Sequence, residues 1–105
     1  MCVLNKITKV LRKMGSLECL KKAETLEIDV SRAGILNLRN LGLTPTNAVA
    51  LADILKQEKI NNSDFIKSIS LSYNHLMGDS GVIAIVESLP LSIGEIGLVD
   101  CGISD

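Results

Sequence analysis

The stretch SISLSYNHLMGDSGVIAIVESL, residues 68–89, combines two hydrophobic patterns within one short segment. Its first four residues alternate between polar and apolar side chains, which is typical of a strand with one buried face. Its last ten residues, 80–89, carry apolar side chains at the spacing of an amphipathic helix. The stretch therefore predicts a strand, a turn and a helix, in that order.

Residues 34–55, GILNLRNLGLTPTNAVALADIL, repeat this order of patterns. They align with residues 68–89, with Leu36 on Ile69, when one extra residue is allowed in the later copy. An internal repeat of this length is the signature of repeat architectures. We therefore expect two similar strand-and-helix units.

The two expected helices carry local signals of their own. Thr44 is a candidate N-cap, and Pro45 suits the first helical position because its missing N–H costs nothing there. Each helix also has an apolar stripe at helical spacing. The stripes are Ala48, Leu51, Ala52 and Leu55 in the first helix, and Val82, Ile85, Val86 and Leu89 in the second.

A third copy begins in residues 93–105, because IGEIGLVDCGISD aligns with IKSISLSYNHLMG, residues 66–78. Both segments read I-x-x-I-x-L-x-x-[N/C]-x-[L/I], with Asn74 and Cys101 at the Asn/Cys position. This pattern resembles the leucine-rich repeat of the ribonuclease-inhibitor-like class, in which an amphipathic helix follows each strand.

The resemblance implies an α/β fold, a leucine-rich-repeat solenoid with parallel strands on the concave side and helices on the convex side. It covers residues 33–105, as two full units plus a third strand, and departs from the consensus at Leu41. Such solenoids bind other proteins through the outward residues of their strands. The candidate protein-binding residues are Asn37, Arg39, Asn40, Ser70, Ser72, Tyr73, Gly97, Val99 and Asp100.

Residues 1–32 are expected to form an N-terminal helical cap and a lead-in strand. Residues 3–14, VLNKITKVLRKM, place apolar side chains at helical spacing, so we expect a helix packed over the first strands. With only four basic residues, a helix that binds a membrane or a partner is the less favoured alternative. A short second helix capped by Ser16 follows, and the alternation in TLEIDV, residues 25–30, predicts a strand.

The tetrapeptide GDSG, which begins at Gly78, also occurs around the nucleophile of trypsin-like serine proteases. A serine nucleophile needs an oriented base and oxyanion donors, but the chain has one histidine, His75, and nothing else that is protease-like. We interpret the tetrapeptide as a turn in which Asp79 or Ser80 caps the helix. Gly78 then supplies permissive backbone angles, and Gly81 allows a close approach.

Composition narrows the classes of function. Lys and Arg number 11 against 12 Asp and Glu, and aromatic residues make up 2%, so neither nucleic acid nor a membrane surface is an expected partner. Three cysteines without a CxxC pair favour a reducing compartment, and we expect a cytoplasmic protein. No metal-ligand spacing, P-loop or dinucleotide turn occurs, so we expect no cofactor, no metal ion and no enzymatic activity.

Two hypotheses of function remain open. The first is a protein–protein interaction module that uses its concave strand face and belongs to a longer repeat protein. Tyr73 is then the best single anchor, because tyrosine is enriched in binding hot spots. The alternative is a structural or self-associating segment with no dedicated ligand, which forms a homodimer through an open C-terminal repeat.

Overall fold

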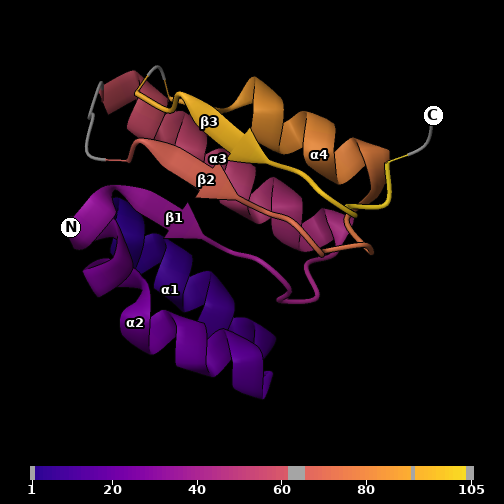
Figure 1. Ribbon diagram of the computed structural model, residues 1–105, viewed down its shortest axis with the longest axis horizontal. Coiled ribbons are helices and arrows are strands. Elements are labelled where there is room, and N and C mark those ends of the chain that lie inside the picture. The colour runs from indigo at the N-terminus through magenta and orange to yellow at the C-terminus, as the bar shows by residue number, and fades with distance from the viewer. Residues whose placement is uncertain (1, 62–65, 91, 104–105) are drawn as a thin grey trace.

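The computed structural model describes residues 2–61, 66–90 and 92–103. Helices and strands alternate along the second half of the chain, whereas the first third is helical (Figure 1). The elements are α1 (Cys2–Met14), α2 (Leu17–Ala33), β1 (Ile35–Asn37), α3 (Pro45–Asn61), β2 (Ser68–Ser70), α4 (Gly78–Glu87) and β3 (Glu95–Gly97).

The three strands form one parallel sheet in the order β1-β2-β3. Leu36 pairs with Ile69, and Ile69 pairs with Ile96, so the positions aligned in the sequence are neighbours in the sheet. The crossover helices α3 and α4 pack against each other and lie behind the sheet in Figure 1. The side chains of Leu36 and Ile69 are buried in the core between the sheet and these helices.

The predicted leucine-rich-repeat solenoid is wrong. The molecule is a compact body of 33 × 29 × 20 Å, in which helices of 13, 17, 17 and 10 residues outweigh strands of three residues each among the described residues. α1 and α2 follow each other with no strand between them, and α1 packs against both α2 and α3. The first third of the chain therefore closes the core and does not add a stacked strand-and-helix unit.

The predicted lead-in strand at residues 25–30 is also wrong, because this segment is part of α2. Ser16 caps α2 as expected, and its Oγ accepts a hydrogen bond from the Cys19 backbone N–H over 3.2 Å. The helix then continues to Gly34, whose positive φ of 69° ends it. The buried side chains of α2 recur at helical spacing, and they are Cys19, Ala23, Leu26 and Val30.

The helix predicted over residues 3–14 is confirmed as α1. Its buried side chains Leu4, Ile7 and Leu11 belong to the same core as the inner side chains of the sheet. The predicted location over the strands is wrong, because α1 packs against α2 and α3 while α2 is the helix that packs against β1. α2 is therefore the helix that lies beside the β1 edge of the sheet.

The predicted start of α3 is confirmed. Asn47 N–H donates to Thr44 Oγ1 over 3.3 Å, and Thr44 N–H donates to Asn47 Oδ1 over 3.0 Å, so the two residues cap the helix reciprocally. Pro45 is the first helical residue. The predicted stripe is buried, and it consists of Ala48, Leu51, Ala52 and Leu55.

The predicted cap of α4 is wrong. The helix begins at Gly78, so Asp79 and Ser80 lie in its first turn, and the N-cap position falls on Met77. The backbone role of Gly78 is confirmed, since its φ is 68°. Met77 has helical backbone angles and makes no side-chain capping hydrogen bond, and the chain turns into α4 at Gly78.

The buried side of α4 is narrower than its apolar pattern predicted. Val82 and Ile85 are buried and Leu89 is half-buried, but Val86 is 45% exposed. α4 stands beside α3 on one side only (Figure 1), so a side chain on its other side has no helix to pack against.

Because Ser80 is an exposed residue within the first turn of α4, Ser80→Ala is expected to change the free energy of unfolding by less than about 0.5 kcal/mol. The matched control is Thr44→Ala, which removes a true cap and is expected to cost about 1 kcal/mol. Urea unfolding followed by circular dichroism measures both. A loss of 1 kcal/mol or more in Ser80→Ala would restore Ser80 as a cap.

Candidate functional site

The residues predicted to bind a partner lie together on the side of the sheet opposite α3 and α4, which we call the open face (Figure 1). Asn37 pairs with Ser70, and Ser70 pairs with Gly97, so these three residues form one row across the strands. The open face continues into the turns that follow the strands. It comprises Ile35, Asn37, Arg39, Asn40, Ser68, Ser70, Ser72, Tyr73, Glu95, Gly97, Val99 and Asp100.

Three turns at the end of the open face share one unusual backbone conformation. Asn40, Tyr73 and Asp100 have positive φ angles of 53°, 66° and 53°. Asn and Asp adopt this conformation readily, whereas for a bulky residue such as tyrosine it costs about 1–2 kcal/mol. The neighbouring turn helps to hold it, because Tyr73 N–H donates to the carbonyl of Val99 in the turn after β3 over 2.7 Å. Tyr73 is thus fixed at the middle turn of three.

Arg39 and Tyr73 form a pair on the open face. The guanidinium carbon of Arg39 lies 5.2 Å from the centre of the Tyr73 ring, which is within cation–π distance. Both side chains are exposed, Tyr73 to 43%. The pair therefore presents a ring and a cation to solvent on a rigid backbone, and Tyr and Arg are the residue types most enriched in binding hot spots.

The centre of the open face is flat and built of small residues. A Cβ atom at Gly97 would lie 3.1 Å from Ser70 Oγ and 3.3 Å from Ser72 Oγ, so the serines fill the space where a side chain would stand. Ser72 is 4% exposed, and its Oγ accepts a hydrogen bond from Val99 N–H over 3.1 Å. Ser72, predicted to contact a partner, is therefore buried and holds the backbone of the turn after β3.

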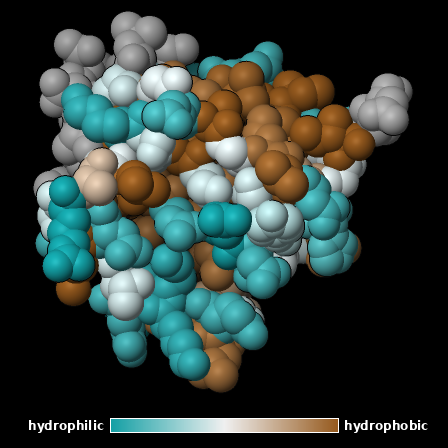
Figure 2. All heavy atoms as spheres, in the orientation of Figure 1, coloured by the Kyte–Doolittle hydropathy of each residue, from teal (hydrophilic) through white to brown (hydrophobic). Residues whose placement is uncertain are grey.

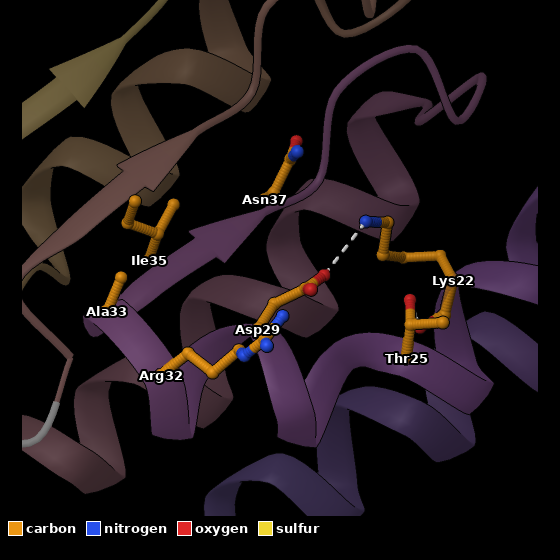
Figure 3. A pocket seen from close by; sticks show the side chains of 7 residues that line it. All are labelled: Lys22, Thr25, Asp29, Arg32, Ala33, Ile35 and Asn37. Atoms are coloured by element: carbon orange, nitrogen blue, oxygen red, sulfur yellow. Dashed lines mark hydrogen bonds and ion pairs between the residues drawn. The ribbon is translucent and has the colours of Figure 1, made fainter.

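A groove between α2 and the open side of β1 was not predicted from the sequence (Figure 3). Its volume is about 490 Å³, and Lys22 Nζ forms an ion pair with Asp29 Oδ2 at 3.2 Å beside it. Figure 3 shows Ile35 and Asn37 projecting from the same side of β1. The lining residues are Lys22, Thr25, Asp29, Arg32, Ala33, Ile35 and Asn37. The sequence did not indicate the α2 residues of this groove, because the alternation over residues 25–30 predicts a strand there.

A buried polar side chain holds the turns beneath the open face. Asn74 is fully buried, accepts hydrogen bonds from Leu41 N–H at 2.9 Å and Leu43 N–H at 3.2 Å, and donates to the carbonyls of Leu38 at 2.8 Å and Leu71 at 2.7 Å. One side chain thus joins the turns after β1 and β2. The departure from the repeat consensus at Leu41 leaves no orphaned N–H, because Asn74 satisfies it.

Cys101 occupies the position after β3 that Asn74 occupies after β2. Its thiol is buried and donates to the Leu71 carbonyl over 3.1 Å. Burial raises the pKa of Cys101 above its ordinary value, the charge of Asp100 adds to this shift, and a hydrogen bond with the backbone of Asn74 opposes it. The thiol therefore stays protonated at neutral pH and serves the packing of the turn.

The described parts of the chain also bear on metal sites, membrane-spanning helices and a serine nucleophile. No group of three His, Cys, Asp or Glu side chains there is placed to hold a metal ion. Across the same residues, the helices are all too short or too polar to cross a membrane. His75 and Ser80 are both exposed around the start of α4.

Comparison of the chain with family models, curated proteins and solved structures found no match. The resemblance to the leucine-rich repeat therefore stays a prediction from the sequence. The geometry of the open face and of the groove beside it is the basis for a functional interpretation.

Figure 2 shows how polarity is distributed on the side of the molecule that carries the open face. Hydrophilic side chains cover most of α1 and α2, whereas apolar side chains gather over β3 and α4. Exposed apolar residues of that end include Val99 and Ile103 after β3, and Ile83 and Val86 on α4. The surface around β3 and α4 is therefore more apolar than that of α1 and α2.

Proposed function

We propose that this chain is a protein-interaction domain that binds a polypeptide partner across its open face. The observation that carries this proposal is the Arg39–Tyr73 pair, which is exposed and held on a sheet surface that neither α3 nor α4 covers. The domain acts by binding, with no enzymatic step and no cofactor. Its buried free thiols Cys19 and Cys101 favour a reducing compartment, and we propose a cytoplasmic location.

The rest of the open face supports binding in two ways. The small, flat centre formed by Ser70 and Gly97 lets a partner backbone approach the sheet closely. The turns that carry Arg39 and Tyr73 are fixed by backbone hydrogen bonds and by Asn74, so little side-chain and loop freedom is lost when a partner binds. A preorganised Tyr–Arg pair beside a flat surface is the arrangement expected of a hot spot.

Self-association is the second candidate function, because the apolar end of the sheet is exposed. β3 is the outer strand of the sheet and is followed by Val99, which is 60% exposed, and Ile103, which is 50% exposed. An exposed apolar edge strand is a template for pairing with another chain. Sedimentation velocity over a hundredfold range of concentration distinguishes the two functions, since self-association predicts a dimer that dissociates on dilution.

Binding at the open face can be tested without knowing the natural partner. Peptides that bind the chain are selected from a random displayed library, and their Kd is measured for the wild type and for Tyr73→Asn. Asparagine tolerates the positive φ of this position, so the substitution removes the ring and keeps the turn. We expect Kd to rise at least about tenfold, as for a hot-spot tyrosine.

The matched control is Val49→Ser, which changes a half-exposed apolar side chain on the outer side of α3. We expect it to leave Kd unchanged. Peptides that lose affinity in Val49→Ser while binding Tyr73→Asn as tightly as the wild type would place the binding surface on the helices and overturn the proposal.

A further inference from the structure

The charges of this chain are divided between its two ends. All 11 Lys and Arg residues lie in residues 1–67, and residues 68–105 contain none. The charged residues of that second segment are acidic, and they are Asp79, Glu87, Glu95, Asp100 and Asp105. A net charge of −1 for the whole chain therefore conceals a strong internal polarity.

On the open face this division sets a positive end against a negative end. Lys22 and Arg32 line the groove between α2 and β1, and Arg39 follows β1. Asp29 is the one acidic residue among the described residues that line the groove, and it is paired with Lys22. Among the described residues, the guanidinium of Arg32 forms no ion pair. The groove thus carries one cation in excess, with Arg32 free to meet an anion.

Two more carboxylates of α2 lie near these cations. Glu24 lines a pocket between α1 and α2 that also contains Arg12. Glu27 lines that pocket and also a second one with Arg32 and Lys67. Around Arg32 the cations Lys22, Arg32 and Lys67 therefore still outnumber the carboxylates Glu27 and Asp29, and the β1 end of the open face keeps a positive character.

The opposite end of the open face carries Glu95 and Asp100. Glu95 begins β3 and is in register with Ser68 of β2 and Ile35 of β1, so it belongs to the same outward row as the groove residue Ile35. Both acidic side chains are exposed. The outward residues between the two ends, Ser68, Ser70 and Gly97, are uncharged.

The spacing of the two ends follows from sheet geometry. Adjacent strands lie about 4.8 Å apart, so β3 is about 10 Å from β1, and the cations of α2 lie about 5–10 Å beyond β1. The two charged ends are therefore separated by about 15–20 Å. An extended polypeptide rises about 3.3 Å per residue, so about five residues of a partner span this distance.

We propose that the open face binds an extended polypeptide segment with an acidic residue near one end and a basic residue about five positions away. The acidic side chain enters the groove beside Arg32, and the basic side chain lies toward Glu95 at the start of β3. The segment therefore crosses the strands in one fixed direction. This inference depends on the proposed function and names the chemistry of the partner that the open face selects.

The test uses the library peptides whose affinity depends on Tyr73. We expect them to carry an acidic and a basic residue four to six positions apart. Arg32→Glu is expected to raise their Kd about tenfold, and changing the acidic residue of the peptide to Lys is expected to restore binding to within about threefold. Glu95→Lys is likewise expected to raise the Kd of these peptides about tenfold, and changing the basic residue of the peptide to Glu is expected to restore binding.

Three comparisons make this test specific. Asp53→Lys, on an exposed position of α3, changes net charge by the same amount as Glu95→Lys and is expected to leave Kd unchanged. Changing the basic residue of the peptide to Glu should not rescue Arg32→Glu. All effects of Arg32 and Glu95 should weaken as salt is raised.

The outcomes separate this inference from the proposed function. Peptides that require Tyr73 but carry no separated charges, and that bind Arg32→Glu as tightly as the wild type, would overturn the charge polarity and leave the binding function standing. If no selected peptide depends on Tyr73, the proposed function and this inference both fail.

Discussion

Asn74→Ala is expected to lower the free energy of unfolding by at least about 3 kcal/mol, because it removes four buried hydrogen bonds at once. The amide of Asn74 is fully buried and bonds to two N–H groups, of Leu41 and Leu43, and to two carbonyls, of Leu38 and Leu71. An unsatisfied buried polar group costs about 1–3 kcal/mol, and a domain has only about 5–15 kcal/mol of stability. Urea unfolding at pH 7 measures the loss.

The control is Asn5→Ala, which truncates an exposed asparagine on α1 and is expected to change stability by less than about 0.5 kcal/mol. Asn74→Asp is a second informative variant, since a carboxylate still accepts from the two N–H groups but cannot donate to the two carbonyls. We expect it to be as damaging as alanine. A loss below 1 kcal/mol in Asn74→Ala would show that these turns are held in another way.

Gly81→Leu is expected to cost about 3 kcal/mol, the upper end of the range for overpacking a well-packed core. A Cβ atom at this position would lie 2.6 Å from Met77 Cγ and 3.1 Å from Ala48 Cβ, where α4 approaches α3. The predicted close approach at Gly81 is thus confirmed. The gain in helix propensity on replacing glycine is at most about 1 kcal/mol and cannot compensate.

Gly94→Ala is the matched control, because a Cβ atom there would meet nothing within 4 Å and its backbone has no positive φ. We expect it to be neutral or slightly stabilising. If Gly81→Leu were as stable as Gly94→Ala in urea unfolding, α3 and α4 would not be as close as the structure places them.

The register of the sheet could be predicted from the sequence because its signal is local and repeated. Leu36, Ile69 and Ile96 each sit in a short alternating segment, and aligning these segments gives the observed pairing. The same alternation identified the outward residues Asn37 and Ser70. It does not extend to Tyr73, which is exposed because the chain turns after β2, with a positive φ at this residue, while Ser72 is buried. Such a pattern specifies which face of a strand is buried, and the face opposite follows from it.

Residues 25–30 of α2 are predicted as a strand because a short apolar pattern can fit both the period of a strand and the period of a helix. TLEIDV alternates, but Leu26 and Val30 also continue the helical stripe begun by Cys19 and Ala23. The segment from Leu17 to Ala33 contains neither Gly nor Pro, so nothing ends the helix before Gly34. The helical choice buries Leu26 and Val30 and leaves Ile28 56% exposed.

Local sequence patterns could neither exclude the solenoid nor predict the groove, because both depend on tertiary contacts. A repeat predicts each strand-and-helix unit, but how the rest of the chain packs on these units is decided by tertiary contacts. Here α1 and α2 close the core beside β1 and α3. The groove that contains Arg32 exists only because α2 lies along the open side of β1, which no spacing in the sequence indicates.

A nuclear magnetic resonance titration tests most directly whether the open face binds a polypeptide. The ¹⁵N-labelled chain is titrated with the highest-affinity peptide from the random library, chosen without regard to any variant. The predicted result is that the largest amide shifts gather at Asn37, Arg39, Tyr73 and Val99, while Asp53 on the outer side of α3 does not move. Shifts concentrated on α3 and α4, with Arg39 and Tyr73 unmoved, would contradict it.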